Sequence, residues 1–449
     1  AIGTNALDAV TTVNDNTAIG HDALTANTSG FKNTAVGSGA GEGNTEGDNL
    51  VAVGFNAAEN NTTADDNTAI GSQALFTNTT GAKNTAVGMS ALYNNTAGEN
   101  IAVGVNAMAS NTTGTRNIAI GVDAYDASDT ENDNLAIGYD AMTTNTAGGT
   151  YNIAIGNYAL DALTSGDYNI VVGGGAGTAI NTGSDNTIYG YLAGNALTSG
   201  SDNVALGSTS LYTATTTSGN TAVGSNALKL TTGDSNTAIG RQAMEDNSTG
   251  SNNVAVGMEA MLQNTTGGDN TAIGYGSLEN NTTGTSNVAV GRDALEATTG
   301  NANVGVGHQA GKANTSGQII AIGYQTMQSN TTGTRNIAIG GNAYDSSDTE
   351  SDNLAIGHNA MTANTSGGNY NVAIGNYTMD VLTSGDQNTG VGYQAMSAMT
   401  EAGNCTAVGN WAGVDITTGE SNTVVGSFSG QQITDGQENT SVGRSAGTN

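Results

Sequence analysis

The chain has 449 residues, of which 67 are glycine, none is proline and only 4% are aromatic. Such small side chains bury too little apolar surface to fill a large globular core. The formal net charge of −30 repels phosphate backbones and anionic lipid, so we expect no nucleic-acid partner. No apolar run is long enough for a membrane span, so we expect no membrane insertion in this segment.

A short strand is predicted at the start of each repeat, as in the pentapeptide Asn16–Gly20 (Asn-Thr-Ala-Ile-Gly). From Gly3 to Gly443, a related pentapeptide closes with glycine every 16, 17 or 18 residues. The alternation of its side chains has a period of two, which indicates a β-strand with two different faces. Stacking the repeats predicts an all-β fold, a parallel β-solenoid or β-roll with one coil of about 17 residues per repeat. We expect one continuous array of about 26 coils over residues 1–449.

The glycine directly after the strand is expected at a corner of the coil. A corner needs either a positive φ or a close approach between backbones, and glycine permits both. The corner glycines of the first complete repeats are Gly20, Gly37, Gly54, Gly71, Gly88, Gly104 and Gly121.

An asparagine stands four residues before most of the glycines, and only Leu50, Ile319 and Cys405 replace it. Stacked asparagine side chains can bond to one another along the axis of a β-solenoid, as they do in cross-β assemblies. We therefore predict a structural asparagine ladder. Its first members are Asn16, Asn33, Asn67, Asn84, Asn100, Asn117 and Asn134.

The rest of each repeat is expected to contain a second strand and a turn. A small residue and a larger apolar one, such as Ala23 and Leu24, follow the corner and are interpreted as the start of the second strand. A polar tract such as Asn111–Gly114 (Asn-Thr-Thr-Gly) then has the composition of a turn. Helical repeats are disfavoured, because 17 is no multiple of the helical period and Gly, Asn and Thr form helices weakly.

A longer duplication is superimposed on the short repeat. Asn111–Asp167 is nearly identical to Asn330–Asp386, with an offset of 219 residues. An irregular segment, Tyr125–Glu131, returns as Tyr344–Glu350. The chain is therefore interpreted as an approximate tandem duplication of residues 1–220 and 221–449.

The two faces of the predicted strand differ in bulk. The small Ala column suits the narrow interior of a coil, together with the Leu/Met column. The Thr/Ile and Ile/Val columns would then face outward as a long apolar stripe, which requires a partner. We predict a homo-oligomer with three copies packed around one axis. In the alternative interpretation, both apolar columns lie inside a wider single coil.

The repeated run Asn-Thr-Ala-Ile-Gly-x-x-Ala, from Asn16 to Gly443, resembles the head repeats of trimeric autotransporter adhesins of the YadA type, which are similar to repeats of bacteriophage tail fibres. The resemblance implies a left-handed parallel β-roll, a tight homotrimer and an adhesive role on a cell surface, an extracellular filament or a virion. Its partner would be a host or cell-surface receptor or a glycan. The coil here is longer than in those heads, because of the polar tract.

An alternative function is ligand binding by the solenoid, as in an ice-binding protein with a flat threonine face. The threonine column gives way to aliphatic residues from Ile101 to Ile170 and from Val288 to Val372, which interrupts such a face. An enzyme is not expected. The histidines, His21, His308 and His358, lie too far apart for a metal site or a catalytic triad, and acid pairs such as Asp65–Asp66 suit solvated turns.

We therefore predict no catalytic, cofactor or metal-binding residue, with calcium as a secondary hypothesis. Oxygen-rich turns can hold calcium, and several aspartates lie next to the asparagine column. These are Asp48, Asp133, Asp185, Asp202, Asp269 and Asp352. The sequons at Asn61 and Asn111 would carry sugar only in a glycosylating source. In the variable columns after the glycine, Phe55, Tyr377, Trp411 and Phe428 are either surface contacts or corner fillers.

Overall fold

The computed structural model describes residues 1–9, 15–365 and 367–447. Within these ranges the named elements are three-residue β-strands, and no helix is formed. The chain divides into two compact units, Ala1–Ser225 and Asn226–Asn449. The predicted all-β fold is confirmed, because each unit is a parallel β-solenoid with one strand in every coil of about 17 residues.

The first unit contributes one short strand per coil to a single face. In the part of the unit that the structure describes, the strands are β1 (Thr17–Ile19), β2 (Thr34–Val36), β3 (Val51–Val53), β4 (Thr68–Ile70), β5 (Thr85–Val87), β6 (Ile101–Val103), β7 (Ile118–Ile120), β8 (Leu135–Ile137), β9 (Ile153–Ile155), β10 (Ile170–Val172), β11 (Thr187–Tyr189), β12 (Val204–Leu206) and β13 (Thr221–Val223).

The second unit is built in the same way. Its described strands are β14 (Thr237–Ile239), β15 (Val254–Val256), β16 (Thr271–Ile273), β17 (Val288–Val290), β18 (Val304–Val306), β19 (Ile320–Ile322), β20 (Ile337–Ile339), β21 (Leu354–Ile356), β22 (Val372–Ile374), β23 (Thr389–Val391), β24 (Thr406–Val408), β25 (Thr423–Val425) and β26 (Thr440–Val442).

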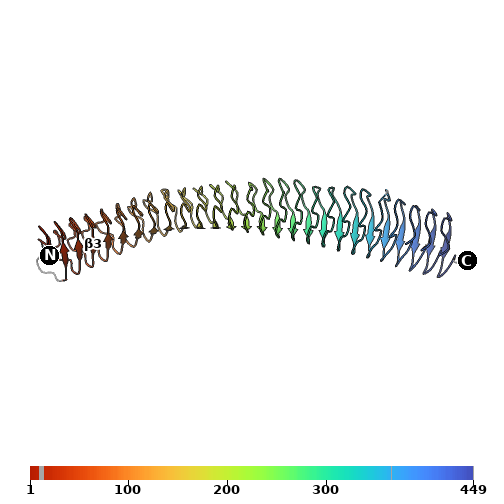
Figure 1. Cartoon of the computed structure of the whole chain (residues 1–449), viewed down its shortest axis with the longest axis horizontal. Helices are drawn as coiled ribbons and strands as arrows, with labels where there is room; N and C mark the ends of the chain where they lie inside the picture. The colour runs from red at the N-terminus through yellow and green to blue at the C-terminus, as the bar shows by residue number, and fades with distance from the viewer. Residues whose placement is uncertain (10–14, 366, 448–449) are drawn as a thin grey trace. The chain divides into compact units, whose positions relative to one another are not determined.

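Within each unit, every strand pairs in parallel with the strand of the next coil, without a shift in register (Figure 1). Thr17 thus lies beside Thr34, and Ile19 beside Val36. Neighbouring paired strands are separated by ~4.8 Å, so each sequence column becomes a straight line of like side chains. The repeat length therefore sets the register.

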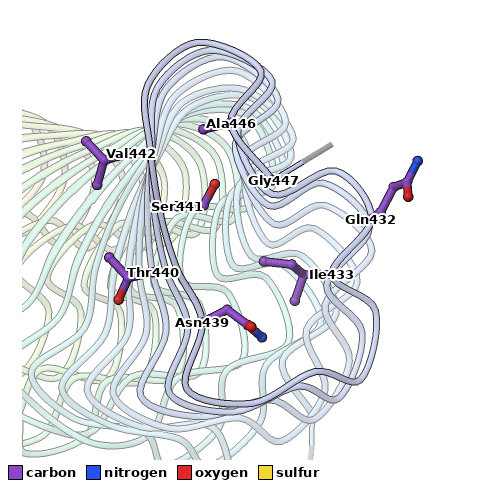
Figure 2. A pocket seen from close by; sticks show the side chains of 8 residues that line it. All are labelled: Gln432, Ile433, Asn439, Thr440, Ser441, Val442, Ala446 and Gly447. Atoms are coloured by element: carbon purple, nitrogen blue, oxygen red, sulfur yellow. The ribbon is translucent and has the colours of Figure 1, made fainter. Parts of the chain in front are cut away.

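The central alanine of the strand points into the coil, and its two neighbours point outward. Ala18 and Ala119 are fully buried, while Ile120 is 39% exposed. At the last described coils of the second unit, Ser441 and Ile433 point inward around a hollow that is the mouth of the coil interior (Figure 2). The alternative with both apolar columns inside a wider coil is therefore wrong, because only the central residue of each strand points into the interior.

The predicted second strand is wrong, since the segment after the corner folds as consecutive turns. In one coil the N–H of Glu42 donates to the carbonyl of Gly39 (3.3 Å), and the N–H of Asn44 donates to that of Gly41 (3.1 Å). Turns of type II have a positive φ at their third residue, as at Gly41 (φ 57°) in the first of these turns. In the preceding coil this conformation falls on Asp22 (φ 58°) and Leu24 (φ 52°), and alternating φ signs prevent an extended strand.

Hydrogen bonds to the next coil hold these turns in place. The N–H groups of Leu24, Ala26 and Thr28 donate to carbonyls one coil further on, at 3.1, 3.0 and 2.9 Å. A left-handed conformation costs a non-glycine residue about 1–2 kcal/mol, so it persists only where the surroundings impose it. The neighbouring coil provides that constraint, and the buried Leu/Met column, such as Leu75 and Met108, fills the interior behind it.

The corner glycines combine a positive φ with a close approach to the next coil. Gly71 has a φ of 139°, and a Cβ there would lie 2.6 Å from the carbonyl carbon of Gly88. Each of the seven predicted corner positions, from Gly20 to Gly121, meets the carbonyl of the following corner glycine in this way. Only a residue without a side chain fits between the stacked corners.

We expect Gly71→Ala to destabilise the fold by about 2–5 kcal/mol, because backbone strain and overpacking add. Gly148→Ala is the matched control, since Gly148 also has a positive φ (104°) but has open space around its α-carbon. The control should cost about 1–2 kcal/mol. Urea unfolding followed by circular dichroism measures both, and equal midpoint shifts would contradict the role of the corner contact.

Candidate functional site

The outer strand face, defined as the residues one and three before each corner glycine, is uncharged, and its side chains are half-buried or exposed. Its members are Ile, Val, Leu and Thr, with Tyr189 as an exception, and none is charged. In the first unit its exposed aliphatic side chains are Ile2, Ile19, Ile70, Ile101, Val103, Ile120, Ile170 and Leu206. In the second unit they are Ile239, Val254, Ile273, Val288, Ile322, Ile337, Ile339, Val408 and Val442.

The face is continuous within each unit because the strands pair in register. An apolar patch that runs over many coils exceeds the few hundred Å² that soluble monomers usually expose. Charged side chains are absent from it although the chain carries a net charge of −30. This combination is typical of a surface that packs against another protein chain.

The asparagine column joins each coil to the next through its side-chain amides. Asn16 Oδ1 accepts the backbone N–H of Asn33 (2.8 Å), and Asn33 Nδ2 donates to the carbonyl of Gly47 (2.8 Å). Carboxamide-to-backbone bonds of this kind recur at all seven predicted ladder residues, Asn16, Asn33, Asn67, Asn84, Asn100, Asn117 and Asn134. Direct amide-to-amide bonds occur as well, as between Asn169 Nδ2 and Asn152 Oδ1 (3.1 Å).

A second asparagine column, which the sequence predicts only as part of a turn, is buried in the polar tract. Asn61 Nδ2 donates to Asn44 Oδ1 (2.8 Å), and Asn78 Nδ2 donates to Asn61 Oδ1 (3.0 Å). The same amide of Asn61 also closes its own turn on the carbonyl of Ala64 (3.0 Å). The signal was present in the sequence, because these asparagines recur with the period of the coil.

Cys405 occupies an asparagine position of the first column. Its N–H donates to Asn388 Oδ1 (2.9 Å), and its Sγ lies 3.2 Å from the carbonyl oxygen of Gly419, which an asparagine amide would otherwise reach. Burial raises the pKa of this thiol above its usual value. A buried, neutral thiol in the ladder is a structural substitute and not a nucleophile.

In the duplicated segment Tyr125–Glu131, Ser128 stands at the position of the turn asparagine, and a tyrosine stands in the buried Leu/Met column. The hydroxyl of Tyr125 accepts hydrogen bonds from Asn134 Nδ2 (2.6 Å) and Asn145 Nδ2 (3.2 Å). Burial raises the pKa of Tyr125 far above its usual range, so the hydroxyl stays neutral. Tyr344 makes the equivalent contacts in the second unit.

The glutamate that ends this segment completes the replacement. The carboxylate of Glu131 accepts the N–H groups of Asp129 (2.9 Å), Thr130 (3.0 Å) and Gly148 (3.1 Å). Glu350 accepts the three equivalent N–H groups in the second unit. The tyrosine and the glutamate thus supply acceptors for buried amides and backbone N–H groups of this coil, while Ser128 Oγ and Asn145 Oδ1 have no partner among the described residues.

An aromatic row, defined as His358, Tyr377, Tyr393, Trp411 and Phe428, lies on five successive coils of the second unit. Neighbouring ring centroids are 5.5, 6.1, 6.0 and 6.4 Å apart in that order. His358 and Tyr393 are exposed, and the other three rings are half-buried. Three of our four surface candidates thus come together, while Phe55 lies in the first unit and is outside the row.

The histidines and the acid pair stand in ordinary surface contacts. His21 Nδ1 lies 2.7 Å from Asp22, and the ring of His308 stacks on Tyr324 at 5.4 Å. Asp65 Oδ1 accepts the N–H of Asp48 (2.8 Å), which is a contact between two coils.

The aspartates of the calcium hypothesis are spread over different coils. Asp133 forms a bidentate pair with Arg116 (2.6 and 2.8 Å), and Asp352 forms one with Arg335 (2.6 and 2.7 Å). The nearby guanidinium lowers the pKa of each of these carboxyl groups. Among the described residues, no three His, Cys, Asp or Glu side chains gather as a metal site would require.

No protein-family model matches this chain, and no curated protein matches it significantly. The resemblance to adhesin head repeats therefore stays a prediction. Among residues 1–9, 15–365 and 367–447, no helix has the length and apolar character to cross a membrane.

We expect Asn67→Ala to destabilise the fold by about 1–3 kcal/mol, because it leaves the buried N–H of Asn84 without a partner. Asn67 Nδ2 donates to the carbonyl of Gly81, and its Oδ1 accepts the N–H of Asn84, both at 2.8 Å. Asn60→Ala is the control, since Asn60 is exposed and makes one side-chain bond, to Phe76. This control should lower the free energy of unfolding in urea by less than about 0.5 kcal/mol. Similar costs for both variants would contradict a structural ladder.

Proposed function

We propose that the chain is the repetitive shaft of an extracellular structural or adhesive fibre, in which three copies pack lengthwise through their outer strand faces. One observation carries the proposal: the alanine column fills the coil interior, so the aliphatic columns beside it remain exposed in both units. A soluble chain rarely leaves such a stripe uncovered.

The energy available from covering this face is large. Burying the exposed part of one such isoleucine contributes about 1.5 kcal/mol. The cost of association is of the order of 4–15 kcal/mol and arises once, whereas the apolar contacts recur along the coils. A partner that follows the strand face over ten or more coils is therefore bound with a net gain.

Another copy of the same chain fits this face best. Its strand face has the same coil rise, ~4.8 Å, and can remain in register over the length of a unit. Each chain offers one such face, and closed cyclic symmetry hides all the faces around an axis. The resemblance to adhesin heads favours three copies, and it also implies the left-handed coil.

The remaining surface suits a fibre outside the cell. Its high negative charge keeps such particles from associating side by side. The proposed locations are a cell surface, an extracellular filament or a virion, and the proposed partner is a receptor or a glycan. Ice binding gains no specific support, since the outer threonine column is broken by aliphatic runs in both units.

Sedimentation equilibrium of the purified chain should give a mass three times that of the 44.4-kDa chain. A folded single chain would contradict the proposal. Two copies would retain lengthwise packing but reject the three-fold arrangement. The far-ultraviolet spectrum, recorded on the same sample, verifies that the material is folded.

The double variant Ile70→Glu/Ile120→Glu should lose the oligomer, because it places two desolvated charges in the proposed interface. Both side chains are about 40% exposed in the single chain, so the fold itself can tolerate the change. Thr63→Glu/Thr113→Glu is the matched control, since these exposed turn residues belong to the same two coils. Its mass should equal that of the wild type. An unchanged mass in the strand-face variant would reject the assigned interface.

A further inference from the structure

We propose that the aromatic row of the second unit binds a neutral polysaccharide that runs along the coils. This inference deepens the adhesive part of the proposed function and rests on it. The row consists of His358, Tyr377, Tyr393, Trp411 and Phe428, each one or two residues after a corner glycine. Aromatic rings at a surface offer apolar faces with a polar rim, on which the C–H face of a sugar can pack.

Each ring is accompanied by an amide or a hydroxyl in the same coil. The other residue of each pair after the corner glycine is Asn359, Asn376, Gln394, Asn410 or Ser427. Asn376 and Asn410 are exposed. A ligand with both C–H faces and many hydroxyls uses such an alternation of rings and amides.

The row and its companion residues contain no carboxylate, no lysine and no arginine. None of these ten positions holds Asp, Glu, Lys or Arg, although the chain as a whole carries a net charge of −30. Elsewhere the same two columns hold charged residues. Examples are Asp22, Asp123, Asp140, Glu259, Arg292 and Asp293. An uncharged aromatic surface favours an uncharged ligand, because charged ligands would find no counter-charge there.

The spacing of the row favours a polymer over a compact ligand. Successive coils are ~4.8 Å apart, a distance comparable to the advance per sugar in an extended glycan. One ring per coil can therefore meet one sugar after another. A polyproline helix, with about three residues of 3.1 Å per turn, would repeat only every second coil.

The rings are held in place before any ligand arrives. His358 and Tyr377 meet at an interplanar angle of 89°, and Tyr377 meets Tyr393 at 83°. Such edge-to-face contacts fix side-chain rotamers and stabilise the pair. A preordered row loses little conformational entropy on binding.

The chain supplies its own probe, because Trp411 is its single tryptophan. The intact protein is titrated with neutral hexasaccharides of β-1,4-glucose, β-1,4-N-acetylglucosamine and α-1,6-glucose, and tryptophan emission is followed. A saturable change with at least one of them is expected. Tyr393→Ala should weaken that binding roughly tenfold or more, as for an aromatic anchor.

Phe55→Ala is the matched control and should bind as the wild type does. Phe55 is 56% exposed in a corner column of the first unit. Its neighbours in the same column are Ser38 and Ser72, so it belongs to no row.

The inference is overturned if no neutral hexasaccharide changes the emission, or if Tyr393→Ala binds as tightly as the wild type. Binding of a proline-rich peptide in place of the sugars, or of a heparin hexasaccharide with equal affinity, also overturns it. The mass of each sample is measured in parallel. A three-chain mass without sugar binding rejects this inference and leaves the proposed fibre unaffected. A single-chain mass rejects the proposed fibre, and the titration then shows separately whether the aromatic row binds sugar.

Discussion

The hydrogen bond from one coil to the next is the interaction on which this structure depends. Each coil has only three residues of regular strand, and most of its backbone lies in turns that could not persist alone. The N–H and C=O groups of these turns are satisfied by the neighbouring coil and by the amide of a buried asparagine. A chain with alternating signs of φ, as at Asp22 and Leu24, is therefore stable only as a stack.

The direction of the central strand residue determines which strand side chains lie on the surface of the coil. The central residue of the strand points into the coil, and because successive strand residues point to opposite faces, residues such as Ile70 and Ile120 face outward. In a globular fold a helix layer would cover such a face. A solenoid of this width has no such layer, and the most economical cover is another solenoid with the same rise.

The sequence predicts those structural features whose residues recur at the same position of every repeat. The spacing from Gly3 to Gly443 gives the coil, and the alternation around Ala18 gives the inward and outward faces. The pattern does not predict the backbone conformation after the corner. Leu24 has the side chain of a strand residue, but its positive φ places it in a turn. The aromatic row was also hidden, because its rings alternate between two sequence columns, as in Tyr393 and Trp411, and come together only when the coils stack.

The repeat separates residues that hold the fold from residues that are free to vary. Glycine, asparagine and alanine satisfy the corner, the backbone and the interior, so the two positions after the corner glycine carry little of the folding energy. They can hold Ser38, Arg292 or Trp411 while the coil keeps the same register. Folding therefore does not explain why five successive coils place rings there without a charged neighbour. Contact with a ligand along the coils accounts both for the continuity of the row and for its neutrality.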